Sequence, residues 1–142
     1  MSKLRHVGIV VTNMEKSLGL YRDCFGFDVI WDEIEEGSFI DNLLDMENVK
    51  VRTVKMKDES GGVIELLQYY SHLGQNDKSL ISKIGCSHLA LTVKDLDLLY
   101  ENLTQQGIKF NYPVQTSSDG NVKVAFCSDP DGTWIELVEE LA

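Results

Sequence analysis

Two stretches of this sequence align with each other: HVGIVVTNMEKSL at residues 6–18 and HLALTVKDLDLLY at residues 88–100. Each begins with a histidine, continues with an alternating apolar run, and reaches a short polar residue before an apolar pattern at helical spacing. The offset between them is 88 − 6 = 82 residues. Self-similarity at a fixed offset indicates a duplicated structural unit. Each half is therefore predicted to open with a strand followed by a helix.

The helix signals recur in both halves. Asn13 and Asp95 suit the N-cap position, because a short side-chain oxygen accepts from the unpaired N–H groups of the first helical turn. Gly26 and Gly107 suit the helix ends. Between these limits, apolar residues fall on one helical stripe: Met14, Leu18, Tyr21 and Phe25 in the first half, and Leu96, Leu99, Tyr100 and Leu103 in the second.

The rest of each half reads as strands and turns. Residues 58–62 and 129–132 are rich in Asp, Gly, Pro and Ser, which favours tight turns. Strands are predicted at residues 27–34, 49–57 and 63–70, and again at 109–114, 123–128 and 134–138. The order is βαβββ twice, with modules at residues 1–70 and 85–142 and a polar linker at 71–84. This predicts an α+β fold in which one domain, residues 1–142, contains two related modules.

The composition and charge of the chain limit its possible partners and cellular location. The chain of 142 residues has a net charge of −10 and a pI near 4.6, which argues against a nucleic-acid partner, since phosphates would be repelled. It contains no apolar run near the roughly 18 residues of a membrane helix. The N-terminus lacks a signal-peptide pattern, and Cys24, Cys86 and Cys127 have no paired spacing. We therefore expect a cytoplasmic protein with reduced thiols.

Four polar residues interrupt strands that otherwise look buried. Side chains two apart share a strand face, so His6 lies with Gly8 and opposite the aliphatic residues at 7, 9 and 11. His88 lies with Ala90, also opposite aliphatic residues. Glu65 and Glu136 each stand between Ile and Leu in the repeated IEL triplets. The four side chains are predicted to point away from the helix-covered core.

Taken singly, a histidine at a strand start or a glutamate on an edge strand is more simply structural. A carboxylate among aliphatic residues is costly unless its charge is compensated, and here it occurs twice, each time with an equivalent histidine. Two carboxylates balance the charge of one dication, and four ligands leave two octahedral positions for a chelating substrate. The conjunction predicts a divalent metal site made by His6, Glu65, His88 and Glu136.

The segments HVGIVV, SLGLYRDCFGF, GGVIELL, HLALTV and DPDGTWIELVE together resemble the vicinal oxygen chelate superfamily. This group includes glyoxalase I, methylmalonyl-CoA epimerase, extradiol dioxygenases, fosfomycin-resistance enzymes and bleomycin-binding proteins. The resemblance covers nearly the whole chain. It implies paired βαβββ modules with curled mixed sheets around one divalent ion (Ni, Co, Zn, Mn or Mg), held by the same four residues.

The resemblance also ranks the branches. Dioxygenases and fosfomycin enzymes typically use three protein ligands, and bleomycin-binding members generally lack the set, so four candidates favour the glyoxalase I and epimerase branches. Glyoxalase I typically carries two residues that bind glutathione: an Arg four residues after the first His, and an Asn four residues after the first Glu. This sequence has Val10 and Tyr69 there, a departure that argues against a glutathione conjugate as substrate. Binding proteins and dioxygenases remain the alternatives.

The chemistry implied is a metal-dependent isomerase, epimerase or lyase acting on adjacent oxygens of a small substrate. The metal would act as a Lewis acid that stabilises an enediolate, while Glu136 and Glu65 are the candidate catalytic bases. Glu47 is a further acid/base candidate, more simply explained as a loop charge. Cys86 is not expected to bind the metal, because oxygen and nitrogen ligands already complete the set. Identical subunits pairing as a dimer is the default expectation. The substrate, and whether one chain or two complete each site, stay open.

Overall fold

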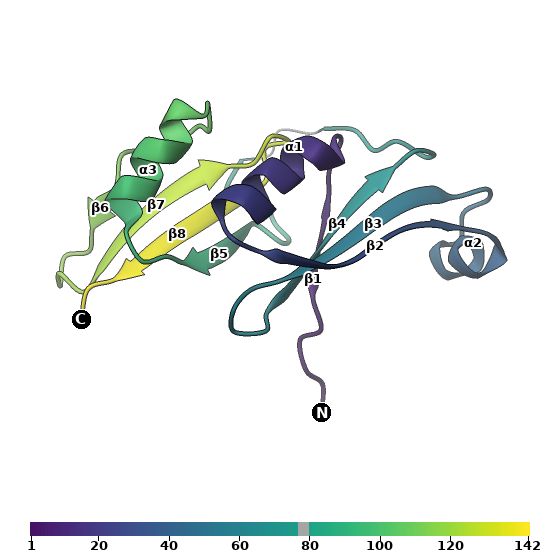
Figure 1. Ribbon diagram of the computed structural model, residues 1–142, viewed down its shortest axis with the longest axis horizontal. Helices are drawn as coiled ribbons and strands as arrows, with labels where there is room; N and C mark the ends of the chain where they lie inside the picture. The colour runs from purple at the N-terminus through teal and green to yellow at the C-terminus, as the bar shows by residue number, and fades with distance from the viewer. Residues whose placement is uncertain (77–79) are drawn as a thin grey trace. The chain divides into compact units, whose positions relative to one another are not determined.

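The computed structural model describes residues 1–76 and 80–142. The chain divides into two compact units, Met1–Asn76 and Asp77–Ala142, each of which contains one sheet (Figure 1). Residues 77–79 of the predicted linker lie outside the described residues. Within the described ranges, no helix has the length and apolar character needed to cross a bilayer.

The first unit is a four-stranded mixed sheet with one long helical segment. In chain order its elements are β1 (Val7–Val10), α1 (Met14–Leu18), the π-helical continuation η1 (Gly19–Cys24), β2 (Asp28–Glu36), α2 (Ser38–Leu44), β3 (Lys50–Lys57) and β4 (Val63–Tyr69). The strand order is β1-β4-β3-β2. Strands β1 and β4 run parallel and the other pairs antiparallel.

The second unit repeats this topology. Its elements are β5 (His88–Thr92), α3 (Leu96–Gln105), β6 (Gln115–Thr116), β7 (Val122–Ser128) and β8 (Trp134–Glu140). The strand order is β5-β8-β7-β6, again with a parallel first pair. The predicted α+β fold of two βαβββ modules with mixed sheets is confirmed.

Two segments differ from the sequence-based expectation. Residues 109–114 were expected to form a strand, and that prediction is wrong: Phe110 makes one isolated bridge to Cys127, and regular pairing begins only at β6. Pro113 explains this, because proline has no N–H to donate to a ladder. Helix α2 was not expected. Its segment belongs to the extra length of the first half, since the repeat offset falls from 82 at the histidines to 136 − 65 = 71 at the glutamates.

One face of each sheet carries the apolar core. Asn13 and Asp95 cap the helices as predicted, each accepting from a backbone N–H three residues on at 3.1 Å. The helices bury apolar side chains against alternate strand residues. The buried side chains include Ile9, Val11, Met14, Leu18, Leu20, Tyr21, Phe27, Val54, Met56, Ile64 and Leu66 in the first unit, and Leu96, Leu103, Ala125, Cys127, Ile135 and Leu137 in the second.

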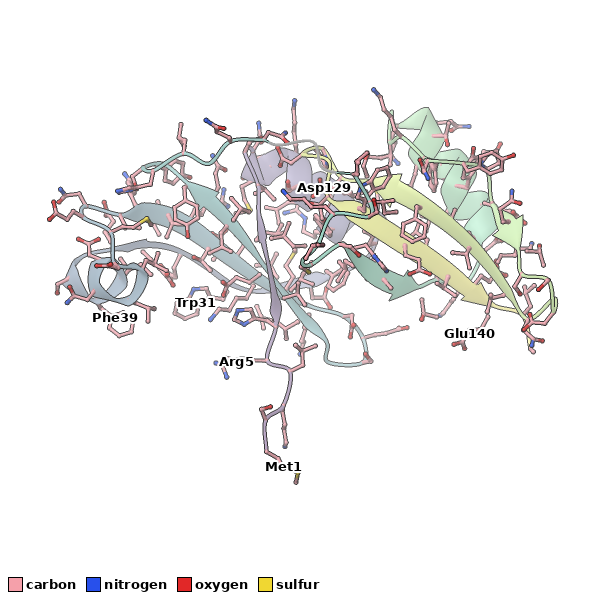
Figure 2. The ribbon with its side chains drawn as sticks, turned by 180° about the vertical axis from the view of Figure 1, so that it is seen from behind. Met1, Arg5, Trp31, Phe39, Asp129 and Glu140 are labelled. Atoms are coloured by element: carbon pink, nitrogen blue, oxygen red, sulfur yellow. The ribbon has the colours of Figure 1, made fainter. Side chains whose placement is uncertain are left out.

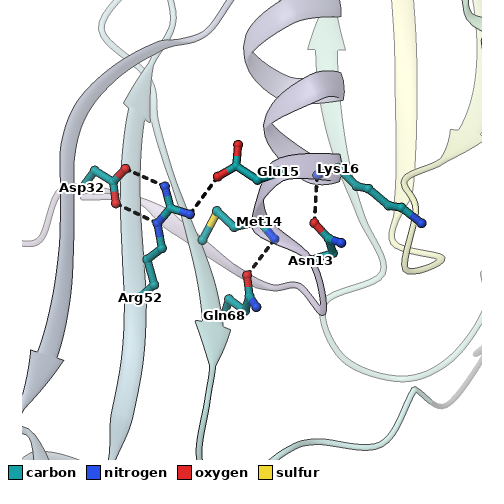
Figure 3. Close-up of polar contacts among 7 residues, drawn as sticks. All are labelled: Asn13, Met14, Glu15, Lys16, Asp32, Arg52 and Gln68. Carbon is teal, nitrogen blue, oxygen red and sulfur yellow. Dashed lines mark hydrogen bonds and ion pairs between the residues drawn. The ribbon is translucent and has the colours of Figure 1, made fainter.

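A side chain from the last strand of each unit anchors the helix N-terminus to the sheet. In the first unit Gln68 Oε1 accepts from the Met14 N–H at 2.7 Å (Figure 3). In the second, Glu139 Oε2 accepts from the Leu96 N–H at 2.9 Å. These pairs are repeat-equivalent, since 14 + 82 = 96 and 68 + 71 = 139. Each bond satisfies one of the donors that a helix start leaves unpaired.

An ion pair reinforces each anchor. Arg52 on β3 binds Asp32 on β2 through two nitrogens, at 2.9 and 2.8 Å, and donates to Glu15 in the first turn of α1 at 2.9 Å (Figure 3). The equivalent contact in the second unit joins Lys123 and Asp97 at 2.6 Å. The guanidinium of Arg52 lowers the pKa of the Asp32 carboxyl, chiefly through the hydrogen bond between them.

Both predicted turns have the same internal bonding. Asp58 Oδ1 accepts from the N–H groups of Ser60 and Gly62, each at 2.8 Å. Asp129 Oδ1 accepts from the N–H groups of Asp131 and Thr133, each at 2.9 Å. A side chain that mimics a backbone turn in this way sets the hairpin geometry. Each turn thereby sets the register of the two strands that it joins.

Replacement of Arg52 tests the helix anchor. We expect Arg52→Met to lower the free energy of unfolding by about 1 kcal/mol at neutral pH, since the partner carboxylates are partly exposed and screened. The pKa of Asp32 is depressed in the folded protein, so this stabilisation is present above the ordinary value of 3.8 and is lost as the pH falls through the depressed value. Urea titrations of both proteins from pH 7 downward should show the difference shrink in acid; a constant difference would contradict the assignment.

Thiol accessibility tests the face assignment of β7. Burial, helped by the Asp129 carboxylate, raises the pKa of Cys127 to about 12, whereas Cys86 is exposed. Because the thiolate is the reactive form, we expect iodoacetamide to alkylate Cys86 in the native protein and to spare Cys127 until denaturant is added. Peptide mass spectrometry distinguishes the two positions. Equal native rates at both would show that β7 presents the other face to the core.

Candidate metal centre

The first unit brings His6 and Glu65 together. His6 immediately precedes β1, and Glu65 lies in the middle of β4 opposite Gly8 in the parallel register. The Nε2 atom of His6 is 3.6 Å from Oε2 of Glu65, and the two side chains are 28% and 15% exposed. Gly8, two residues after His6, adds no side chain to this part of the sheet. The pair is therefore partly sheltered but open to a small ligand.

The second unit brings His88 and Glu136 together in the same way. Ala90 on β5 pairs with Glu136 on β8, as Gly8 pairs with Glu65. The distance from Nε2 of His88 to Oε2 of Glu136 is 3.0 Å. Ser87 Oγ lies 2.6 Å from the other ring nitrogen, Nδ1. A partner on Nδ1 orients an imidazole and leaves its Nε2 directed to a ligand.

Strand alternation places both pairs on the side of the sheet opposite the buried core. On β4, Glu65 stands between Ile64 and Leu66, which are 3% and 0% exposed. On β8, Glu136 stands between Ile135 and Leu137, both fully buried. The prediction that the glutamates face away from the helix-packed core is confirmed within each unit. The convergence of the two pairs on one ion stays a prediction.

The donor atoms of each pair are spaced as two ligands of one ion would be. Ligand atoms about 2.1 Å from a common ion lie about 3.0 to 3.4 Å apart at octahedral or tetrahedral angles, close to the observed 3.6 and 3.0 Å. Neutral imidazole and carboxylate are also the donors that Zn, Ni, Co and Mn accept. Among the described residues, however, no three His, Cys, Asp or Glu side chains form a group that could hold a metal ion. One pair alone supplies half of a protein ligand set.

The structure adds neighbours that the sequence analysis missed. Lys55 on β3 is the cross-strand partner of Glu65, with its Nζ 3.9 Å from the Glu65 carboxylate. Trp31 on β2 is in turn the cross-strand partner of Lys55, and the Lys55 ammonium lies 5.7 Å from the centroid of the Trp31 ring. The turn at residues 58–62 is the sequence feature that predicts the Lys55–Glu65 pairing. Counting back from a tight hairpin places residue 57 opposite 63, and residue 55 opposite 65.

The equivalent neighbour in the second unit is aromatic. Phe126 on β7 pairs with Glu136, and its ring meets His88 edge-on, with centroids 5.2 Å apart. Lys55 and Phe126 are repeat-equivalent, since 55 + 71 = 126. We call each His–Glu pair with its neighbours a half-site. The two half-sites share a histidine and a glutamate, but the residue beside the glutamate is a cation in the first and an uncharged aromatic ring in the second.

Other candidates lie elsewhere. Glu47 and Cys86 are exposed, and neither makes a described contact with the His–Glu pairs. Tyr69 packs against a cluster formed by Ile40 of α2 together with Val49 and Val51. The positions of Glu47, Cys86 and Tyr69 therefore give no support for a role of these three residues in the site.

Comparison with known proteins identifies the family. Residues 3–137 match the model of the Glyoxalase/Bleomycin resistance protein/Dioxygenase superfamily. A lactoylglutathione lyase of Schizosaccharomyces pombe is 29% identical over 146 residues, covering 97% of this chain and 47% of that protein. A probable lactoylglutathione lyase of Synechocystis is 28% identical over 137 residues, covering 96% and 94%. This chain spans about half the length of the yeast relative.

A solved structure agrees on the fold. A glyoxalase family protein from Bacillus cereus superposes with a TM-score of 0.92, covering 100% of this chain and 96% of that one at 19% identity. The chain belongs to the Glyoxalase/Bleomycin resistance protein/Dioxygenase superfamily. This is the vicinal oxygen chelate group whose sequence features were recognised above, and that prediction is confirmed.

Proposed function

We propose that this protein is a metal-dependent lyase or isomerase in which His6, Glu65, His88 and Glu136 hold one divalent ion. The observation that carries the proposal is the duplicated pair: in each unit a histidine Nε2 lies 3.0 to 3.6 Å from a glutamate oxygen, on the face opposite the core. The duplication supports one ion shared by both pairs, because each pair alone leaves a shell half filled. The charge of the two glutamates also favours a dication, because two carboxylates neutralise it.

When bound, the ion supplies Lewis acidity at two adjacent oxygens of a small substrate. The protein's own contribution is to orient the substrate and to move a proton at the neighbouring carbon. Glu136 and Glu65 are the proposed bases, because each carboxylate lies on the sheet face opposite the helix-packed core and stands beside a histidine. Two carboxylates suit removal and return of a proton on different faces of the substrate. A dimer of identical subunits in the cytoplasm is part of this proposal.

The first test is metal binding. We expect the purified protein to bind one Ni, Co, Mn or Zn ion per two His–Glu pairs. His6→Ala and Glu136→Leu should each weaken binding by more than about 100-fold, since even the loss of an outer-shell partner costs about 10- to 100-fold. His72→Asn is the control: it removes the third histidine, at a left-handed position (φ 50°) that asparagine tolerates. Titration calorimetry gives the affinities, and a His6→Ala protein that binds like wild type would refute the ligand set.

The second test is proton exchange. In D₂O the metal-loaded protein should exchange deuterium into the carbon beside the carbonyl of a small vicinal hydroxy-carbonyl compound, followed by NMR. Glu136→Gln should slow exchange by at least about 100-fold, the usual contribution of a general base. Glu140→Gln, at the exposed end of the same strand, should leave the rate unchanged. Full exchange in Glu136→Gln would remove this residue from the mechanism.

Lactoylglutathione lyase activity is the second candidate, because the Schizosaccharomyces pombe relative bears that name and the Synechocystis relative is named a probable lactoylglutathione lyase. It predicts turnover of the adduct of methylglyoxal and glutathione by the same metal-loaded protein. Val10 and Tyr69 occupy the positions where the glutathione-binding Arg and Asn of that branch are expected, and neither carries a charge. Turnover that needs glutathione would favour this candidate over the small-substrate isomerase.

A further inference from the structure

We propose that Lys55 binds a carboxylate of the substrate, so that the protein prefers substrates with an anionic group beside the two chelated oxygens. This inference rests on the proposed function of the His6–Glu65 half-site and names the substrate class for it. No role for Lys55 follows from the His–Glu pairs themselves.

Lys55 is held in the right place by the register of the first sheet. Gly8, Glu65, Lys55 and Trp31 are successive cross-strand partners on β1, β4, β3 and β2. The row lies on the face opposite Val54 and Met56, which are fully buried in the core. Trp31 is 47% exposed, and its side chain is seen on the first unit in Figure 2. The ammonium group therefore lies beside a candidate ligand, with an aromatic ring next to it.

The contacts of Lys55 leave its charge available. Its Nζ is 3.9 Å from Glu65 Oε2, at the outer limit of an ion pair, and the side chain is 30% exposed. The indole face of Trp31, 5.7 Å away, attracts the cation without neutralising it. Once Glu65 donates to a dication, its negative charge is shared, and the ammonium then loses part of its attraction to that carboxylate. An anionic group on the bound substrate then replaces the attraction that the Lys55 ammonium loses.

The fold does not require a lysine here. The repeat-equivalent residue, Phe126, occupies the same cross-strand position beside Glu136 and packs on His88. The sheet thus accepts an aromatic ring in place of the ammonium. Since the chain carries a net charge of −10, an anion approaching this protein is repelled in general. A positive group next to the candidate metal ligand gives an anionic substrate a favourable contact at that point.

The experiment compares two chelators that differ by one carboxylate. Acetohydroxamate presents two vicinal oxygens, and malonomonohydroxamate presents the same two with a carboxylate on the methyl carbon. Affinities of the Ni-loaded protein for both are measured by calorimetry, and the ratio of the two cancels the chelation that they share. In Lys55→Gln the preference for malonomonohydroxamate should fall about tenfold, the size of one charged hydrogen bond. Lys55→Arg should retain the preference.

Lys50→Gln is the matched control. Lys50 lies on the same strand, and its ammonium is also 5.7 Å from an aromatic centroid, that of Tyr70, yet it is far along β3 from Glu65. Its replacement should leave the ratio unchanged. Lys55→Gln should bind Ni at least as tightly as wild type, because a cation next to the ion has been removed.

The outcomes separate the two proposals. If wild type and Lys55→Gln bind Ni and acetohydroxamate alike but show the same preference for the carboxylate, the inference about Lys55 is wrong and the metal proposal stands. If wild type binds no Ni, the metal proposal fails, and the inference fails with it. Loss of the preference in Lys50→Gln as well would show a general charge effect and would also overturn the role of Lys55.

Discussion

Each sheet in this protein has one face covered by a helix, and strand alternation divides every strand between that face and the other. The aliphatic residues that flank Glu65 and Glu136 are buried under the helices, which forces the carboxylates to the opposite side. A shift of register by one residue would exchange the two sets. The placement of the candidate ligands thus depends on the same burial that stabilises the fold.

Two local devices maintain that register. The Asp-based turns join β3 to β4 and β7 to β8, and their side-chain bonds set which residues face each other across the hairpins. The anchors from Gln68 and Glu139 then hold the helix starts against the sheets. The first anchor is neutral and the second is a carboxylate at a helix N-terminus, where negative charge is favoured. The repeat has kept the geometry while the chemistry of the groups has changed.

The same divergence distinguishes the two half-sites. His and Glu are retained in both, and so is the small residue, Gly8 or Ala90, that pairs with each glutamate. Beside the glutamate, the first unit has Lys55 and the second has Phe126. A duplicated unit that kept its His–Glu pair and varied the residue beside the glutamate is in keeping with our two proposals, in which the pairs bind the metal and Lys55 selects the substrate.

From the sequence alone, the repeat, the helix caps, the tight turns and the strand faces followed from local rules: apolar periodicity, short capping side chains and turn-forming residues. Those rules were enough to name four candidate ligands. The hairpin turn also implies that Lys55 lies opposite Glu65, but the approach of Trp31 to Lys55 and of Phe126 to His88 emerged only in the tertiary structure. They depend on which residues lie side by side after the chain has turned back on itself, and contacts between segments distant in sequence leave no periodic trace in either one.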